Sequence, residues 1–345
     1  MKSDNPLLLQ RILKRVSRSF YLTLIVVPPC VREQIGLAYL FARAADTIAD
    51  TDLIERRRRL LLLQEFRAQF AGAEGVSREA IRAIQAAVIP HQADSGERRL
   101  LERLDDCFRL YGDLGSEDRE RIRRLMATLT NGMEMDLTCF PGDSAETLTA
   151  LPTLDEMDRY TYYVAGCVGE FWTGMMCAHL PSLSRWNADE MAGLGVRFGK
   201  GLQLTNILKD LARDLKRGRC YIPESLLQEA GLAPRDLLKG DALPALRPVL
   251  RRLVTAAVEH LDHGWLYTMA IPRREVRLRL ACMWPILFAG GTLGRVASSA
   301  ELLNPNVIPK ISKGEVYRVM AATTLTGGCG YIGTAYWGML RKRVL

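Results

Sequence analysis

The stretch QLTNILKDLARD, residues 203–214, decides which fold and chemistry to expect from this chain. Its apolar residues recur at helical spacing, and Asp210 and Asp214 stand four residues apart. Residues i and i+4 lie on one face of a helix, so both carboxylates would point to the same place. Carboxylates on an otherwise apolar helix need a positive partner to offset their lost hydration. A bound cation would supply that charge.

A second stretch, YLFARAADTIAD at residues 39–50, repeats the spacing with Asp46 and Asp50. Arg43 precedes Asp46 by three residues and therefore shares its helix face. Mg²⁺ favours oxygen ligands and is commonly held by a few carboxylates together with substrate phosphates. If the two pairs face each other across a cavity, they would hold two or three Mg²⁺ ions around a diphosphate.

Helical periodicity dominates the 345 residues, and strand signals are sparse. Long helices are expected at 31–50, 116–137, 153–178, 189–215, 246–270 and 277–298. No linker forces a boundary, so we expect one all-α domain over residues 1–322, a helical bundle with a central apolar cavity, and a C-terminal tail at 323–345. Arg56 to Arg59 could bind phosphate, but a solvated helix face is the better interpretation.

The composition indicates a soluble protein, with 48% apolar residues, 25% charged residues and a formal net charge of +8. A basic surface suits nucleic acid, anionic lipid or a phosphorylated small substrate, but no nucleic-acid motif accompanies it. The eight cysteines are scattered, as expected of free thiols in a reducing compartment. We find no secretory pattern and no uninterrupted apolar run of spanning length; the nearest is 321–340. We expect a cytoplasmic protein, with at most a peripheral contact with the inner membrane to release a lipid product.

Other catalytic classes fit less well. The chain has no P-loop pattern and no GxSxG motif. Glycines at 193, 195, 199 and 201 lie within a helical pattern rather than after a strand, so they are not a dinucleotide fingerprint. Cleaving carbon from diphosphate leaves a carbocation, and the apolar helices could supply the dry walls that this reaction needs.

Five segments together resemble the squalene/phytoene synthases, which join prenyl diphosphates head-to-head. They are Ser17-Arg18-Ser19-Phe20, the first aspartate motif from Tyr39 to Asp50, Tyr163-Val164-Ala165-Gly166-x-Val168-Gly169, the second aspartate motif from Gln203 to Asp214, and Arg219-x-Tyr221-Ile222-Pro223. The match extends over residues 15–300. Lys209 departs from the family pattern, where many members have Arg; it keeps the charge but loses the bidentate geometry.

The resemblance implies an isoprenoid synthase fold and assigns roles to residues. Catalytic roles would fall to Tyr163, Tyr39 and Arg43. Substrate contacts would fall to Ser17, Arg18, Ser19, Phe20, Gln203, Asn206, Lys209, Arg219 and Tyr221. Mg²⁺ would be bound by Asp46, Asp50, Asn206, Asp210 and Asp214.

Within the family, three features favour squalene synthase, which reduces presqualene diphosphate with NADPH: the Ser-Arg-Ser-Phe form, Ala270-Ile271-Pro272, and Lys310-Ile311-Ser312-Lys313-Gly314-Glu315. By this resemblance Lys310, Lys313 and Arg318 would bind the phosphates of NADPH, although a solvated helix start is equally plausible. The alternatives are a phytoene or dehydrosqualene synthase without reduction and a catalytically inactive binding relative. The intact aspartates count against the inactive relative.

Overall fold

A computed structural model gives the fold and describes residues 7–17, 21–71, 76–328 and 330–344. Most of these residues are helical, and the strands within them are two short segments, β1 Thr149–Ala150 and β2 Arg219–Cys220, which pair in parallel. The all-α prediction is confirmed. Residue contacts divide the chain into two compact units: unit 1 comprises Met1–Leu137 with Phe171–Ser184, and unit 2 comprises Thr138–Glu170 with Arg185–Leu345.

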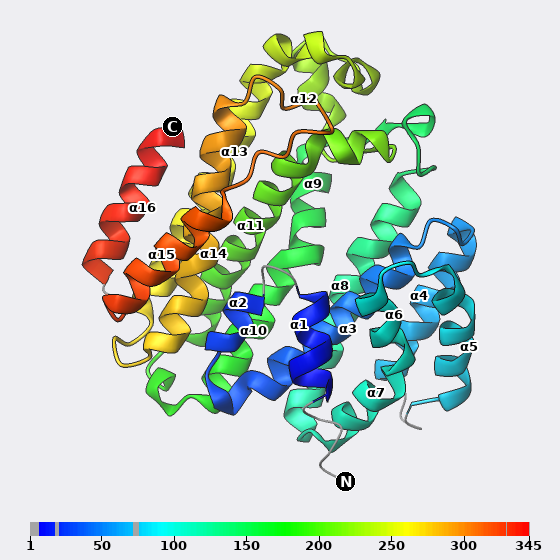
Figure 1. The fold of residues 1–345 in the computed structure, drawn as a ribbon, viewed down its shortest axis with the longest axis vertical. Helices are drawn as coiled ribbons and strands as arrows, with labels where there is room; N and C mark the ends of the chain where they lie inside the picture. Colours follow the sequence, from blue (N-terminus) through cyan, green and yellow to red (C-terminus); the bar gives the residue numbers. More distant parts are fainter. Residues whose placement is uncertain (1–6, 18–20, 72–75, 329, 345) are drawn as a thin grey trace. The chain divides into compact units, whose positions relative to one another are not determined.

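Unit 1 holds the N-terminal helices (Figure 1). They are the π-helix Leu7–Ile12, α1 Leu13–Val16, α2 Tyr21–Val26, α3 Arg32–Asp50, α4 Arg56–Ala71, α5 Arg78–Val88, α6 Ser95–Glu102, α7 Leu104–Asp113 and α8 Ser116–Cys139, which ends in unit 2, with short 3₁₀ turns at Pro29–Val31, Ile89–His91 and Pro181–Leu183.

Aromatic side chains form the core of unit 1 around α3. Phe41 is fully buried, and its ring centroid lies 4.8 Å from the centroids of both Phe70 on α4 and Phe108 on α7. The ring of Tyr111 on α7 packs edge-on against Phe41 at 5.9 Å. Edge-to-face aromatic pairs of this kind contribute about 0.5–1.5 kcal/mol beyond their buried area. The cluster therefore fixes α3, and with it the first aspartate motif.

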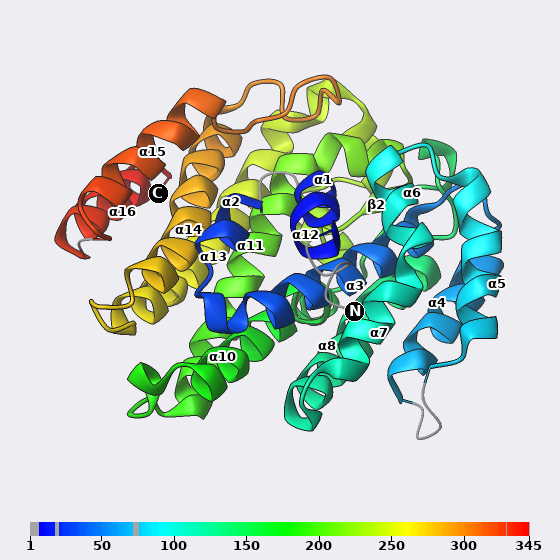
Figure 2. The ribbon, with the colours of Figure 1, turned by 60° about the horizontal axis from the view of Figure 1, so that its bottom comes forward.

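Unit 2 is built around the long helix α11 (Figure 2). Its helices are α9 Leu154–Thr161, a π-helix at Tyr162–Gly166, α10 Cys167–His179, which ends in unit 1, α11 Ala188–Lys216, α12 Glu224–Glu229, α13 Leu243–Ala270, α14 Val276–Ser298, α15 Lys313–Leu325 and α16 Gly330–Val344, with short 3₁₀ turns at Ala145–Thr147, Pro234–Leu238 and Gly240–Ala242. Helices α13 and α14 pack against α11.

Close backbone contact joins α11 to the segment that carries Tyr163. A Cβ placed on Gly169 would lie 2.0 Å from the carbonyl oxygen of Gly195, and one on Gly199 would lie 2.2 Å from that of Ala165. Only residues without a side chain permit this approach. The continuous helix predicted at 153–178 is wrong in one respect, because a π-turn at Tyr162–Gly166 interrupts it. Such turns insert one residue into a helix, and periodicity in the sequence does not reveal them.

The segment predicted as a C-terminal tail, residues 323–345, contains a helix, α16, which packs on α14 and α13. Its buried positions are Gly333, Trp337 and Leu340, at helical spacing. The indole ring of Trp337 stacks on that of Trp265 at 6.2 Å, and its Nε1 donates to Asp262 Oδ1 at 2.8 Å. Small and aromatic residues on one face of α16 thus pack it onto the core, although the Gly-rich and Thr-rich sequence gives little sign of a helix.

One helix among the described residues, α14, is long and apolar enough to cross a membrane. Two-thirds of its apolar window, 67%, is buried inside the protein. A core helix of a soluble bundle has the same length and composition, so α14 is weak evidence for a membrane span.

Candidate active site

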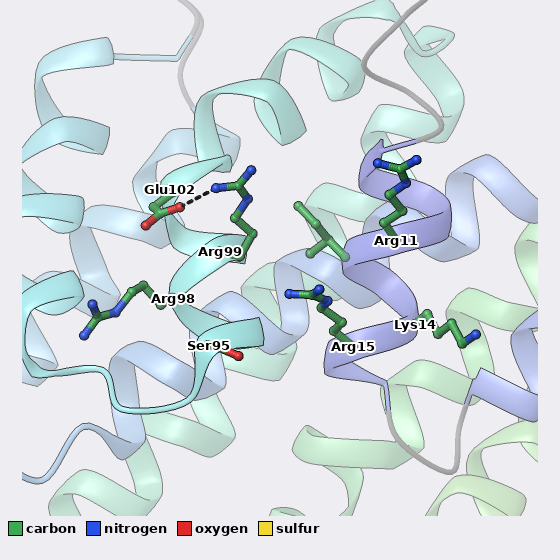
Figure 3. Close-up of a pocket in the computed structure, with 8 residues that line it drawn as sticks. Arg11, Lys14, Arg15, Ser95, Arg98, Arg99 and Glu102 are labelled. Carbon is green, nitrogen blue, oxygen red and sulfur yellow. Dashed lines mark hydrogen bonds and ion pairs between the residues drawn. The ribbon is translucent and has the colours of Figure 1, made fainter.

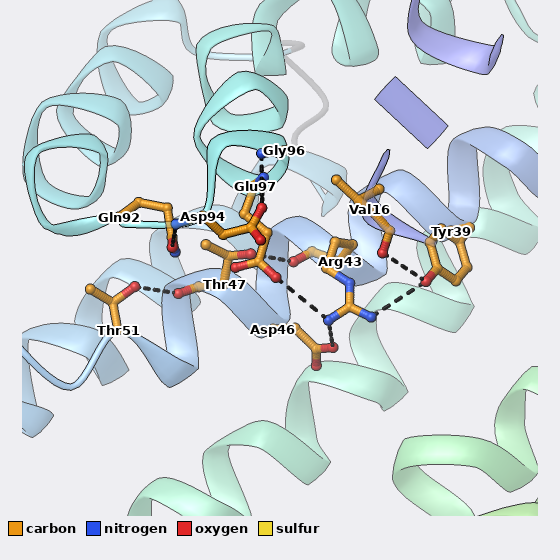
Figure 4. A network of polar contacts seen from close by, with 10 residues as sticks. All are labelled: Val16, Tyr39, Arg43, Asp46, Thr47, Thr51, Gln92, Asp94, Gly96 and Glu97. Carbon is orange, nitrogen blue, oxygen red and sulfur yellow. Dashed lines mark hydrogen bonds and ion pairs between the residues drawn. The ribbon is translucent and has the colours of Figure 1, made fainter. Parts of the chain in front are cut away.

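Arg43 lies at the centre of a polar network on α3, shown in Figure 4. Its Nη2 donates to the hydroxyl of Tyr39 at 3.4 Å, and its Nη1 lies 3.4 Å from Asp46 Oδ2. The same Nη1 lies 4.0 Å from Glu97 Oε1 on α6. The Tyr39 hydroxyl donates to the carbonyl oxygen of Val16 at 3.4 Å. The structure thus brings together three predicted site residues and adds Glu97, which the sequence analysis missed.

Glu97 owes its position to the start of α6. Asp94 caps this helix, because its Oδ1 accepts hydrogen bonds from the backbone N–H groups of Gly96 at 2.8 Å and Glu97 at 3.0 Å. Asp94 and Glu97 stand three residues apart, a spacing typical of helix starts. The sequence therefore signalled the helix start, but only the packing of α6 on α3 places Glu97 beside Arg43.

The surroundings of Asp46 favour a neutral carboxyl. Burial among protein atoms is the main cause that raises its pKa to about 7; Arg43 opposes this rise, and Asp50 and Glu97 add to it. The side chain still keeps 47% of its surface accessible, so neighbouring atoms displace bulk water without closing off the carboxylate. Burial lowers the pKa of Arg43, but Asp46, Tyr39 and Glu97 raise it more, so the guanidinium stays charged. Burial therefore outweighs the attraction of Arg43 at this carboxyl.

The C-terminal end of α3, which carries Asp50, is fastened by α4. The guanidinium of Arg59 is buried, and its Nη1 donates to the carbonyl oxygen of Ala49 at 3.0 Å. Within the last turns of α3, Thr51 Oγ1 donates to the carbonyl oxygen of Thr47 at 2.6 Å. The solvated face expected for Arg56 to Arg59 is therefore wrong for Arg59, although Arg57 and Arg58 are exposed. A cation at this position satisfies a helix-end carbonyl and complements the helix dipole.

The predicted N-terminal substrate segment is described only at Ser17. This side chain is buried, and its Oγ donates to the carbonyl oxygen of Leu13 at 2.5 Å. Its hydroxyl therefore secures the end of α1. Arg18, Ser19 and Phe20 lie outside the described residues, and their substrate contacts stay predictions.

On α11, Lys209 contacts two residues of the second aspartate motif. Its Nζ donates to Asn206 Oδ1 at 3.0 Å and lies 3.1 Å from Asp210 Oδ2. Asp214 and Gln203 are half-buried on the same helix. The positive charge expected at Lys209 is thus in contact with Asn206 and Asp210. Each aspartate motif therefore has a cation beside a carboxylate: Lys209 beside Asp210, and Arg43 beside Asp46. That the two aspartate pairs face each other stays a prediction.

Tyr163 lies in the π-turn, half-buried beside Tyr162. The ring centroids of the two tyrosines are 6.0 Å apart. The Tyr162 hydroxyl donates to Glu170 Oε2 at 3.0 Å, and burial together with this carboxylate raises the pKa of Tyr162 to about 12. Lys200 Nζ lies 6.0 Å from the Tyr162 ring centroid. Tyr162 is therefore engaged in a local network with Glu170 and Lys200.

Arg219 and Tyr221, which follow α11, contact other residues of unit 2. The ring of Tyr221 is buried, stacked on Tyr160 at 4.8 Å and edge-on to Phe140 at 5.2 Å. Arg219 Nη2 lies 3.7 Å from Asp143 Oδ1. The structure therefore gives Tyr221 a packing role and Arg219 an ion pair, and their substrate contacts stay predictions.

Lys310, Lys313 and Arg318 are exposed at the start of α15. Ser312 caps this helix and Glu315 completes a capping box, while Glu315 also accepts from Arg295 Nη2 at 2.6 Å. The three cations are accessible, which suits both a phosphate contact and a solvated helix start.

A separate groove in unit 1 runs between the helix at residues 7–16 and α6 (Figure 3). It has a volume of about 750 Å³ and is lined by Arg11, Ile12, Lys14, Arg15, Ser95, Arg98, Arg99 and Glu102. Five basic side chains and a single acidic one give it a positive potential that attracts anions. Ile12 is its only apolar lining residue, so the groove is unsuited to a prenyl chain.

Within the described residues, no group of three or more His, Cys, Asp and Glu side chains is arranged to hold a metal ion. Each aspartate motif instead offers carboxylates on one helix. Their donors are all oxygen atoms, the ligands that Mg²⁺ prefers. The accessible carboxyl of Asp46 also suits a divalent cation.

The chain is similar to known proteins in sequence and in fold. The family model for squalene/phytoene synthase matches residues 13–315. The squalene synthase of Eremothecium gossypii is 26% identical over 97% of this chain and 71% of its own length. The presqualene diphosphate synthase of Sinorhizobium fredii is 31% identical over 75% of this chain and 77% of its own length. The solved structure of TcSQS with the ligand BPH1237 shares the fold, with a TM-score of 0.79, 21% identity, and coverage of 99% of this chain and 92% of that one.

Proposed function

Because the chain belongs to the squalene/phytoene synthase family, we propose that it is a squalene synthase. It condenses two farnesyl diphosphates head-to-head to presqualene diphosphate and then reduces this intermediate to squalene with NADPH. In the first step the C–O bond of one substrate breaks and its electron pair leaves with diphosphate. The double bond of the second substrate attacks the allylic cation, and loss of a proton closes the cyclopropane ring.

The observation that carries this proposal is the network around Arg43. A guanidinium that stays charged beside a carboxylate can bind a diphosphate oxygen as the leaving group gains charge. Its contacts with Tyr39 and Asp46 hold it in place before substrate arrives. Preorganised donors of this kind stabilise a transition state without the cost of reorganising at the moment of reaction.

Mg²⁺ fits the two aspartate motifs. Asp46 and Asp50 on α3 would hold it in one unit, and Asn206, Asp210 and Asp214 on α11 would hold it in the other. The accessible but poorly hydrated carboxyl of Asp46 supports this assignment, since a divalent cation would restore its ionised form. When bound, Mg²⁺ neutralises the leaving diphosphate.

Other residues of the chain would orient the substrates and handle the proton. Lys209 already contacts Asn206 and Asp210 and can reach a phosphate oxygen as a point charge. Tyr163 offers a hydroxyl for proton transfer and a ring face for a nearby cation. Gln203 would contact the substrate from the same helix as Asn206.

In the second step the C–O bond to the remaining diphosphate would break, the diphosphate would leave with the electron pair, and a hydride from NADPH would quench the resulting carbocation. Exposed Lys310, Lys313 and Arg318 would bind the phosphates of NADPH. We place the protein in the cytoplasm, where it would bind its prenyl diphosphate substrates. A peripheral contact with the inner membrane would release the lipid product.

A product assay tests the function. Purified protein is incubated with Mg²⁺ and either farnesyl or geranylgeranyl diphosphate, with and without NADPH, and the products are identified by mass spectrometry. Squalene should form only with farnesyl diphosphate and NADPH. Presqualene diphosphate that persists in the presence of NADPH, or consumption of geranylgeranyl diphosphate alone, would contradict the proposal.

A second candidate is a non-reductive synthase that stops at presqualene diphosphate or proceeds to dehydrosqualene or phytoene. The similarity to a presqualene diphosphate synthase favours it. Substitution of Lys310 and Lys313 by Gln separates the two candidates. If NADPH binds at these residues, the variant should form less squalene but consume farnesyl diphosphate at the parent rate. A non-reductive synthase should give the same products with and without the substitutions.

A further inference from the structure

The basic groove of unit 1 brings together arginines from two helices that are far apart in the sequence. Arg11 and Arg15 lie on the helix at residues 7–16, and Arg99 lies on α6. Arg11 and Arg15 stand four residues apart, so they share one face of their helix. Figure 3 shows the guanidinium of Arg15 directed towards α6, whereas Lys14 and Arg98 point away from the gap between the helices. Three guanidinium groups therefore border the groove.

Two of these guanidinium groups have no carboxylate partner in the part of the chain that the structure describes. Residues 7–17 contain no Asp or Glu, and neither Arg11 nor Arg15 makes a hydrogen bond or an ion pair with another described residue. On α8, by contrast, Arg124 pairs with Glu120 at 2.7 Å. Like charges four residues apart on a helix destabilise it. The pair therefore suits a negative charge that a ligand supplies.

The two walls of the groove are held in place by protein contacts. A Cβ on Gly96 would lie 3.3 Å from the Cβ of Arg15, so the start of α6 packs directly against α1. The carbonyl oxygen of Val16 accepts from the hydroxyl of Tyr39 on α3 at 3.4 Å, and α6 also packs on α3. A site whose walls are already fixed loses less conformational freedom when a ligand binds.

The lining of the groove suits phosphate oxygens. Arginine donates two parallel hydrogen bonds to a phosphate group, and the exposed hydroxyl of Ser95 can donate a further one. The backbone at the start of α6 does not contribute, because Asp94 already accepts from the N–H groups of Gly96 and Glu97. No aromatic residue is among the described residues that line the groove, so a nucleotide base would find no ring to stack on. The volume of about 750 Å³ exceeds that of a single phosphate and accommodates a chain of two or three.

We propose that this groove binds a free oligophosphate chain, either inorganic or carried by a nucleoside triphosphate, at a site that shares no lining residue with the first aspartate motif. Arg11, Arg15 and Arg99 donate to the phosphate oxygens, and Ser95 adds its hydroxyl. Arg99 exchanges its present partner Glu102, at 3.3 Å, for the ligand. Exposed ion pairs of this kind contribute little to stability, so the exchange costs little. The site goes beyond the proposed function, because it requires neither a prenyl chain nor turnover.

Isothermal titration calorimetry of the full chain, in EDTA and without prenyl substrate, tests the site. Inorganic triphosphate and ATP should bind with similar affinity and adenosine should not bind, because the groove contacts phosphates and not the base. Added salt should weaken the binding. Arg11→Gln and Arg15→Gln should each weaken the binding of triphosphate by about tenfold or more, the loss expected of one hydrogen bond between charged groups.

Three further variants locate the phosphates and do not depend on loss of binding alone. Arg58→Gln, at an exposed arginine of α4, should bind triphosphate as the parent does. Arg43→Gln should also retain binding in EDTA, because Arg43 does not line the groove. Glu102→Gln removes the acid of the groove and should tighten binding by about two- to fivefold. Arg11 and Arg15 are exposed, so their Gln variants should keep the parent melting curve in circular dichroism.

Three results would overturn the proposal. The first is no binding of triphosphate at low salt, or equal binding by the parent and the Arg11 and Arg15 variants. The second is binding that only Arg43→Gln abolishes, which would place the phosphates in the Arg43 network. The third is NADPH that binds far more tightly than ATP and loses affinity in Arg11→Gln, because the groove would then belong to the cofactor of the proposed reduction. Since the titration with triphosphate uses no prenyl diphosphate, its failure leaves the product assay unaffected, and a failed product assay leaves the binding result intact.

Discussion

The buried guanidinium of Arg59 on α4 donates to the carbonyl oxygen of Ala49, the residue before Asp50, at 3.0 Å. The end of α3 is therefore held by a charge from a different helix as well as by the hydroxyl of Thr51, which donates to the carbonyl oxygen of Thr47. The bond places a fixed cation at Ala49, within the first aspartate motif and one residue before Asp50. It links the stability of unit 1 to the position of a proposed metal ligand.

Arg59→Met should lower the free energy of unfolding by about 2–3 kcal/mol, because it leaves a buried helix-end carbonyl without this charged donor. Chemical denaturation followed by circular dichroism measures the change. Arg58→Met removes an exposed arginine from the same helix and should change stability by less than about 0.5 kcal/mol. Equal effects of the two substitutions would show that the Arg59–Ala49 bond has no special role.

Arg43→Gln should lower the rate of diphosphate release by about 10²–10³-fold, the usual cost of losing one preorganised donor to a developing charge. A coupled phosphate assay with farnesyl diphosphate measures it. Arg99→Gln, in the basic groove outside this network, is the control and should leave the rate unchanged. If Arg43→Gln raises KM alone, the guanidinium contributes only to substrate binding.

The raised pKa of Asp46 makes a prediction about pH. Because its pKa is about 7 in the folded chain against an ordinary value of 3.8, the folded state binds more protons between these values. The stability of the metal-free protein should therefore fall as pH rises from about 4 to 7, and Asp46→Asn should remove part of that fall. The effect will be smaller than the full shift implies, since the side chain is partly accessible.

Urea unfolding in EDTA at pH 5 and pH 8, for the parent chain and Asp46→Asn, measures the effect. With added Mg²⁺ the parent should recover its stability at pH 8, whereas Asp46→Asn should recover less. Parallel pH curves for the two proteins would contradict the raised pKa, and an equal response to Mg²⁺ would argue against Asp46 as a ligand.

Gly169→Ala should destabilise the protein by about 3 kcal/mol or more, since its Cβ would lie 2.0 Å from the carbonyl oxygen of Gly195. Gly174 on the same helix is a matched control, because a Cβ there would lie 3.9 Å from the side chain of Arg121, an ordinary van der Waals contact. Gly174→Ala should be neutral or stabilising by up to about 1 kcal/mol, as expected from helix propensity. Thermal melts of both variants compare the two positions directly.

The sequence predicts the two long helices that carry aspartates closely: 31–50 against Arg32–Asp50, and 189–215 against Ala188–Lys216. Both have regular apolar periodicity, and Asn187 caps the second through a hydrogen bond to the backbone N–H of Glu190. The spacing of apolar residues is enough to predict the bounds of a helix when each of its turns contributes a side chain to the core.

Features that depend on distant partners were missed. Arg59 looks like a member of a solvated arginine run until α3 is placed above it, and Glu97 looks like an ordinary residue of a first turn until α6 packs beside Arg43. The π-turn at Tyr162 leaves no periodic signal because it is a single inserted residue. In each case the position is decided by tertiary packing rather than by local propensity.

The glycine contacts between the Tyr163 segment and α11 have a consequence for motion. Where main chain lies directly on main chain, no side chain can change rotamer to let the two helices slide. Tyr163 and the second aspartate motif should therefore move as one rigid body during turnover. Any opening that admits the two proposed substrates would have to come from movement elsewhere in the chain. The backbone amides where the Tyr163 segment contacts α11 should be among the slowest in the molecule to exchange hydrogen.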